Sequence, residues 1–225
     1  KMLRLGIRGF LEEMQGKDSD LSRAASIACL ALADYATMLS DQAKALALRE
    51  KNPARADELH EIARICRKVP MEPAETLHEA LQSIWLTHMA VCFEGLNSAV
   101  SFGRIDQYLY PYYENDITKG LITREKALEL LLCFSAKTTE HMFLTSSRAS
   151  EYHGGYLVAQ AATVGGMDAK GSDTVNDLTY LFLDVMEKAG LRDPNYMARI
   201  HKNSPPEYVR RAVDVARQGN AVPGL

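Results

Sequence analysis

The 225-residue sequence predicts an α/β fold, and three observations carry this prediction. Residues 1–93 contain four successive helical patterns of apolar residues and no strand-like alternation. A short apolar, β-prone segment over 156–164 lies between two pairs of glycines. From there to the end, strand and helix patterns alternate, which is the rhythm of an α/β fold.

Residues 1–93 are predicted to form a layer of helices. Apolar residues recur at spacings of three and four, the period of an amphipathic helix, and Gly or Pro residues separate the patterns. The last pattern is apolar around most of its girth, so we expect a buried helix there. The four predicted helices cover 2–15, 21–50, 54–68 and about 75–93.

Residues 94–225 are predicted to contain a loop, further helices and the first strands of a sheet. The segment 94–113 is polar and rich in tyrosine, which favours a packed loop because exposed aromatic rings are costly. It could be a connector without chemistry or part of a site. Thr123 has the sequence context of a helix N-cap. We expect helices over 123–143, from Asp173 or Thr174 to about 189, and over 207–218, with strands over 156–164 and 195–201.

The composition excludes several classes of protein. The chain is 47% hydrophobic and 24% charged with a net charge of −3, as in soluble globular proteins. This charge balance gives no sign of a surface that binds nucleic acid or a membrane. No apolar run is long enough to cross a bilayer, and no secretory signal is present. We therefore expect a cytoplasmic protein. Four cysteines lie in apolar helical patterns and are predicted to be reduced, buried thiols: Cys29, Cys66, Cys92 and Cys133.

Motif searches leave few candidates for chemistry. The histidines and cysteines show no HExxH or CxxC spacing, which argues against a metal site. The paired glycines match neither the phosphate-binding loop nor the dinucleotide fingerprint, and no GxSxG elbow occurs. The cysteines fit inert core thiols better than nucleophiles.

The remaining polar groups each have two open interpretations. Arg104 and Asp106, two apart in a segment predicted to be non-helical, could pair with each other or pin the loop to its neighbours, or they could contact substrate. Ser98 could bind a ligand or satisfy open carbonyls at the end of the preceding helix. Tyr156 could line a cavity or fill core. The sequence alone leaves these alternatives open.

Several ordered segments resemble the glycyl radical enzymes of the pyruvate formate-lyase type. The most specific are GRIDQYLYPYY over 103–113 and TVGGMD over 163–168, which is followed by the pattern N-x-L-TYL. The pattern is closer to the dehydratase and lyase branch than to formate acetyltransferase. Within that branch we expect cleavage of a C–S bond in a sulfonate, isethionate in particular, with arylacetate decarboxylases as the nearest rival.

The resemblance implies a fold. It is a ten-stranded α/β barrel of two antiparallel halves of parallel strands, with helices outside. This chain would be its helix-rich part, within a single domain over 1–225, with a helical layer over 1–93 and the first barrel strands in 94–225. The chain begins inside a helical pattern, so we expect an internal fragment of a longer protein.

The resemblance also implies a cofactor system and partners. A glycyl radical is installed by an activating enzyme that uses S-adenosylmethionine and an iron–sulfur cluster, and it generates a thiyl radical that abstracts hydrogen from a small substrate. No residue of this chain matches the radical glycine or the thiyl cysteine, so no catalytic residue, metal ligand or bound cofactor is assigned here. The fragment alone is expected to be inactive, and the full protein is expected to be a homodimer.

The resemblance assigns roles to particular residues. Ser98 and Ala99 fall where polyol dehydratases carry a substrate-binding His-Ser pair, and Tyr156 falls near an aromatic pocket wall. The absence of that pair argues against a glycerol or propanediol dehydratase. The residues expected to form the structural motif of the family are Arg104, Asp106, Gln107 and Tyr108.

A hypothesis from another class is a non-catalytic helical scaffold or interaction module. It treats the aromatic segment as packing and predicts that the chain folds alone and melts cooperatively. The barrel hypothesis predicts the opposite, because a partial barrel leaves strand edges unpaired and prone to aggregate.

Overall fold

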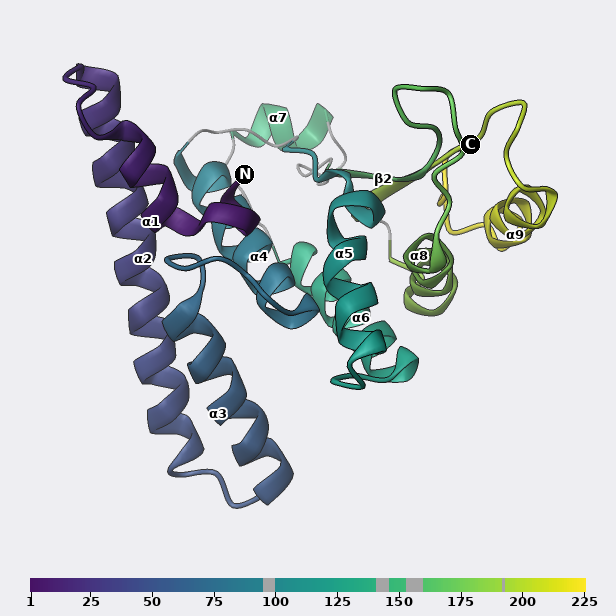
Figure 1. Ribbon diagram of the computed structural model, residues 1–225. Coiled ribbons are helices and arrows are strands. Elements are labelled where there is room, and N and C mark those ends of the chain that lie inside the picture. Colours follow the sequence, from purple (N-terminus) through teal and green to yellow (C-terminus); the bar gives the residue numbers. More distant parts are fainter. Residues whose placement is uncertain (95–99, 141–145, 153–159, 192) are drawn as a thin grey trace. The chain divides into compact units, whose positions relative to one another are not determined.

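The computed structural model describes residues 1–94, 100–140, 146–152, 160–191 and 193–225 (Figure 1). The chain divides into two compact units, Lys1–Ala90 and Val91–Leu225, which are described separately. Whether both belong to one domain, as expected, stays a prediction. None of the helices in the described ranges has the length and apolar character needed to cross a membrane.

The first unit is helical, as predicted. A reciprocal capping box between Ser19 and Ser22 starts its longest helix, and Asn52 caps the next. Gly6 kinks the first helix with φ +64°, and a Cβ there would lie 2.4 Å from the carbonyl oxygen of Met71. The helices are α1 (Met2–Met14), α2 (Asp20–Ala47), α3 (Pro53–Lys68) and α4 (Leu77–Glu94).

Helices α2 and α3 pack along each other (Figure 1). At their contact, the buried Ser40 hydroxyl donates to the carbonyl of Ala63 at 2.6 Å. The residues of α4 from 77 to 90 are buried or half-buried, as its apolar girth predicted, whereas Val91 and Phe93 are exposed. The outer face of α2 exposes large apolar side chains: Leu21, Ile27, Leu30, Tyr35, Met38 and Leu46.

The second unit is built on a parallel sheet with strands in the order β1-β2-β3. The register pairs Gly103 with Ala162 and Ala162 with Tyr196, and Gly224 extends the sheet by a parallel bridge to Met197. Helices α5 and α8 pack against each other and against β2. The elements are β1 (Gly103–Arg104), α5 (Ile105–Thr118), α6 (Arg124–Thr138), α7 (Ser147–Tyr152), β2 (Ala161–Gly165), α8 (Asp177–Ala189), β3 (Asn195–Arg199) and α9 (Pro206–Ala216).

The prediction of a loop over 94–113 was wrong for its second half. Helix α5 starts at Ile105 and runs through Pro111, which costs one backbone hydrogen bond. The helix persists because Ile105, Leu109 and Tyr113, at the i, i+4, i+8 spacing, are all buried. In the sequence, Pro111 and the four tyrosines made this helical spacing of buried residues hard to recognise. Asp106 therefore lies in the first helical turn and not in a loop.

Other boundaries also differ from the prediction. Helix α8 begins at Asp177, three or four residues after the expected start at Asp173 or Thr174, because the side chain of Asn176 and that of Thr179 cap each other's backbone. Helix α6 ends at Thr138 and not near 143. Two short elements, β1 and α7, were not predicted. The cysteine prediction was wrong for Cys133, which is exposed, while Cys29 is half-buried and Cys66 and Cys92 are buried.

Candidate functional site

Arg104 clamps the loop that follows β2. It ends strand β1, so its side chain leaves the carboxyl edge of the sheet. Its guanidinium donates to the carbonyls of Met167 at 2.9 Å and Gly165 at 3.0 Å, and to the Thr174 hydroxyl at 2.6 Å. One turn into α5, the Gln107 amide donates to the Thr174 carbonyl at 2.9 Å. Four hydrogen bonds therefore join the β1–α5 junction to the last residue of β2 and to the loop that follows it.

Asp106 is fully buried beneath the same loop. Its Oδ2 accepts from the Gly165 amide at 2.7 Å and from the Thr179 hydroxyl at 2.6 Å, which ties α5 to β2 and to α8. Burial raises the pKa of this carboxyl group. Within the described residues, Asp106 Oδ1 and Arg104 Nε are buried without a hydrogen-bond partner, and the two residues form no ion pair with each other.

The loop over 166–176 is held from its other side as well. His201 Nε2 and Asp173 Oδ1 lie 3.0 Å apart, and His201 Nδ1 accepts from the Asn203 amide at 3.3 Å. The polar groups at the carboxyl edge thus bind backbone and side-chain groups of the protein itself, and the structural role of the motif stays a prediction.

Tyr108 forms its hydrogen bond at the amino edge of the sheet. Its hydroxyl donates to the carbonyl of Phe102 at 3.0 Å, and burial raises its pKa. The Phe102 amide donates to the carbonyl of Ala161 at 2.8 Å, and its ring packs edge-on against Phe134 at 5.3 Å. The chain that enters β1 is therefore attached to the chain that enters β2.

A second buried polar cluster lies at the amino edge. The Gln160 amide donates to the Thr138 carbonyl at 2.9 Å and to Asp193 Oδ2 at 2.6 Å, and all three residues are buried. Close by, the hydroxyls of Ser135 and Tyr196 lie 2.8 Å apart. This cluster connects the end of α6 with the starts of β2 and β3. The sequence analysis missed it, although a glutamine inside an apolar, strand-like segment was a signal.

The predicted site residues are only partly described. Arg104, Asp106 and Gln107 bind groups at the carboxyl edge of the sheet, and Tyr108 binds Phe102 at the amino edge. Ser98, Ala99 and Tyr156 lie outside the described residues, so their two interpretations stay open. Within the described ranges, no group of three or more His, Cys, Asp or Glu side chains could hold a metal ion.

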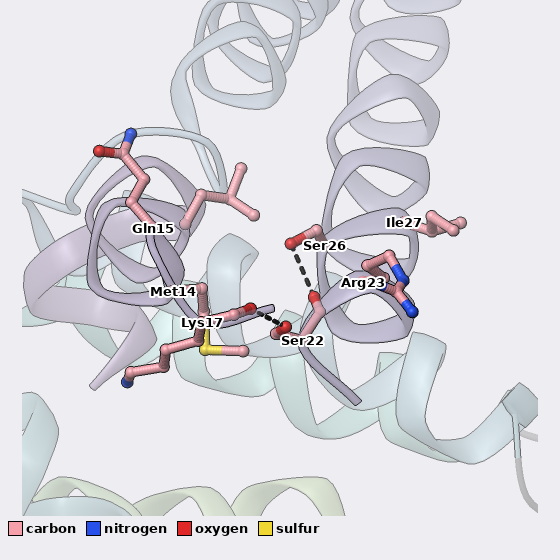
Figure 2. A pocket seen from close by; sticks show the side chains of 8 residues that line it. Met14, Gln15, Lys17, Ser22, Arg23, Ser26 and Ile27 are labelled. Atoms are coloured by element: carbon pink, nitrogen blue, oxygen red, sulfur yellow. Dashed lines mark hydrogen bonds between the residues drawn. The ribbon is translucent and has the colours of Figure 1, made fainter. Parts of the chain in front are cut away.

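A groove of about 490 Å³ lies in the first unit, between the end of α1 and the start of α2 (Figure 2). Two of its polar residues bind within the chain: Arg23 pairs with Asp18 and Asp20, and the Ser26 hydroxyl donates to the carbonyl of Ser22 at 2.8 Å. It contains none of the predicted site residues. Its walls are formed by Leu11, Met14, Gln15, Lys17, Ser22, Arg23, Ser26 and Ile27.

Comparison with known proteins gives a consistent match along the chain. A family model described as pyruvate formate lyase-like matches residues 1–225. An isethionate sulfite-lyase of Oleidesulfovibrio alaskensis is 37% identical over 241 residues, which cover 100% of this chain and 29% of that protein. A trans-4-hydroxy-L-proline dehydratase of Clostridioides difficile is 32% identical over 99% of this chain and 28% of its own length.

Solved structures agree with these matches. A glycyl radical enzyme from Archaeoglobus fulgidus superposes with a TM-score of 0.90 at 39% identity, over 97% of this chain and 30% of that one. The glycerol-bound glycerol dehydratase of Clostridium butyricum superposes with a TM-score of 0.90 at 31% identity, over 99% of this chain and 30% of its own. The predicted helix-rich α/β fold is thereby confirmed. The chain spans less than a third of the length of these relatives.

Proposed function

Because the chain belongs to the pyruvate formate lyase-like family, we propose that the protein containing it is a glycyl radical lyase that cleaves the C–S bond of isethionate. The observation that carries the proposal is the 37% identity to an isethionate sulfite-lyase over the whole chain. A second isethionate sulfite-lyase, from Nitratidesulfovibrio vulgaris, is 36% identical over the same extent. The reaction HOCH₂CH₂SO₃⁻ → CH₃CHO + HSO₃⁻ is balanced without water or an external oxidant.

The proposal assigns the substrate contacts to Ser98, Ala99 and Tyr156. This assignment rests on the family resemblance, since all three residues lie outside the described part of the chain. At the carboxyl edge of the sheet, Arg104 donates to Met167 and Thr174 in the loop over 166–176, and Asp106 accepts from the Gly165 amide at the end of β2.

The proposed cofactor system follows from the family. The glycyl radical, on a residue outside this chain, would supply the thiyl radical that takes hydrogen from the substrate. A partner enzyme with S-adenosylmethionine and an iron–sulfur cluster would install it, and the active protein would be a cytoplasmic homodimer. The described residues of this chain would support the barrel wall, and a closed barrel would protect the radical from water.

The test uses the full-length protein, activated under anaerobic conditions. Electron paramagnetic resonance should show a glycyl radical doublet, and sulfite should form from isethionate but not from choline, glycerol or 4-hydroxyphenylacetate. A doublet without sulfite release would contradict the cleavage of the C–S bond of isethionate but would still support a glycyl radical enzyme. The absence of a doublet after activation would argue for the non-catalytic scaffold.

A dehydratase is the second candidate, favoured by the 32% identity to the trans-4-hydroxy-L-proline dehydratase. It would remove water from a hydroxylated substrate in place of sulfite. Adding trans-4-hydroxy-L-proline to the substrate panel separates the two, because only the dehydratase would consume it without releasing sulfite.

A further inference from the structure

Helix α2 carries two stripes of small and apolar residues on opposite sides. Along both, steps of three and four residues alternate, which is the heptad spacing at which one helix packs along another. The first stripe is buried at the contact with α3, where the Ser40 hydroxyl donates to the Ala63 carbonyl. Its residues are Ala33, Ala36, Ser40, Ala43 and Ala47. The second stripe is exposed and is called the α2 seam; its residues are Ala24, Ala28, Ala31, Tyr35, Met38, Gln42 and Ala45.

The α2 seam is an extended apolar surface that continues into a groove. Met38 is 65% exposed, and Ile27 and Leu46, which lie beside the seam, are 70% and 53% exposed. Ile27 also lines the groove between the end of α1 and the start of α2 (Figure 2). The 28 residues of α2 give it a length of about 42 Å and, at a diameter of about 10 Å, an outer face of about 400 Å². Exposed apolar patches of this size often mark docking sites.

Charge and area argue against a second copy of this chain on the seam. Asp34 follows Ala31 by three residues and precedes Met38 by four, so it borders the seam, and within the described residues its carboxylate forms no ion pair. It also lies at the midpoint of α2. In a two-fold pair of α2 helices along their whole length, parallel or antiparallel, Asp34 would therefore face its own copy, and like charges repel. The outer face also supplies only half of the roughly 800 Å² per partner that a stable complex buries.

We propose that the α2 seam and the adjoining groove hold an amphipathic helix of the same polypeptide from outside residues 1–225. The chain spans 29% of the isethionate sulfite-lyase that it matches, so most of the length of that relative lies outside the chain. A face of about 400 Å² is sufficient within one polypeptide, because the covalent connection provides a high effective concentration.

The seam determines the chemistry of this helix. Four of the seven seam residues are alanines, so the helix carries large apolar residues opposite them, at heptad spacing, to fill the interface. It carries a basic residue beside Asp34 and an acidic one beside Lys17, the groove residue whose ammonium forms no ion pair within the described residues. The inference does not depend on which substrate the enzyme uses.

The first experiment is photo-crosslinking of the purified full-length protein with p-benzoylphenylalanine in place of Tyr35, at the middle of the seam. The expected product is a crosslink to a peptide of the same polypeptide outside residues 1–225, which runs as a monomer on a denaturing gel. A product of twice the mass, a crosslink within residues 1–225 or the absence of a crosslink would each overturn the inference. The control places the same amino acid at Asp57, which is exposed on α3, and should not give this product. The same product from both positions would also overturn the inference.

The second experiment compares Met38→Glu with Leu48→Glu in the full-length protein. Both side chains are large, apolar and exposed in the described structure, at 65% and 82%, but Leu48 lies outside the seam. Met38→Glu would place a carboxylate in the interface and should lower the melting temperature by at least about 2 °C, whereas Leu48→Glu should change it by less than about 1 °C. The elution volume in size-exclusion chromatography should be that of wild type for both. Equal melting temperatures, or a smaller oligomer of Met38→Glu alone, would contradict the inference.

Discussion

Replacing Gly165 by alanine tests the packing at the carboxyl end of β2. Gly165 has φ +68°, and a Cβ there would lie 2.4 Å from Tyr208 Oη and 2.7 Å from its Cζ. Tyr208 has little room to move, because it is fully buried and its hydroxyl donates to the carbonyls of Val164 and Arg199 at 3.3 Å each. Left-handed strain costs about 1–2 kcal/mol and crowding about 1–3, so Gly165→Ala should lose about 2–5 kcal/mol of unfolding free energy.

Urea unfolding of the full-length protein measures this loss. Gly171→Ala is the matched control, since Gly171 has φ +82° but nothing within 4 Å of a Cβ, and should lose only the strain of about 1–2 kcal/mol. Adding Tyr208→Phe to Gly165→Ala removes the hydroxyl contact but not the ring contact, so it should recover part of the difference. Equal losses for the two alanine variants would refute the reasoning and show that Tyr208 moves aside.

Three further predictions concern Asp106, Tyr108 and Arg104. Burial raises the pKa of Asp106, so the folded state holds its proton to higher pH than the unfolded state, and wild-type stability should fall as pH rises from about 3.9 through the raised pKa. Asp106→Asn should not show this loss. If the difference in stability between wild type and Asp106→Asn does not change with pH, the prediction is contradicted. Tyr108→Phe loses the hydrogen bond to Phe102 and should cost about 0.5–1.5 kcal/mol in urea unfolding, where no cost would mean that the bond contributes nothing. Arg104→Lys cannot reach all three acceptors and should cost about 2–3 kcal/mol, with faster amide exchange over 166–174; unchanged exchange would exclude the clamp.

The helices of the first unit were predictable because their signals are local. The Ser19 capping box and the Asn52-Pro53 step are read within four residues of the helix start, and the structure places α2 and α3 close to the predicted bounds. The apolar girth of α4 likewise predicted the burial of its residues up to 90. Local period and caps decide such elements before any tertiary contact forms.

Helix α5 shows where local signals mislead. Pro111 is a helix breaker in isolation, yet the buried stripe of Ile105, Leu109 and Tyr113 keeps the helix intact. Tertiary burial outweighed the propensity of the segment. The same holds for β1, whose two residues pair only because β2 lies beside them.

The resemblance carried by GRIDQYLYPYY and TVGGMD was available from the sequence alone, and with it the family and the fold class. The contacts of Arg104 and Asp106 could not be predicted from the sequence, because their partners are distant in the chain. Asp106 binds residues 59 and 73 positions away, and Arg104 binds Thr174 at a separation of 70. The buried polar cluster around Gln160 could not be predicted either, because the side-chain amide of Gln160 binds Asp193, which is 33 positions further along the chain. Periodicity and caps are properties of neighbours along the chain and can be read there. Which polar groups are buried together is decided only when the parallel strands bring distant segments to one edge.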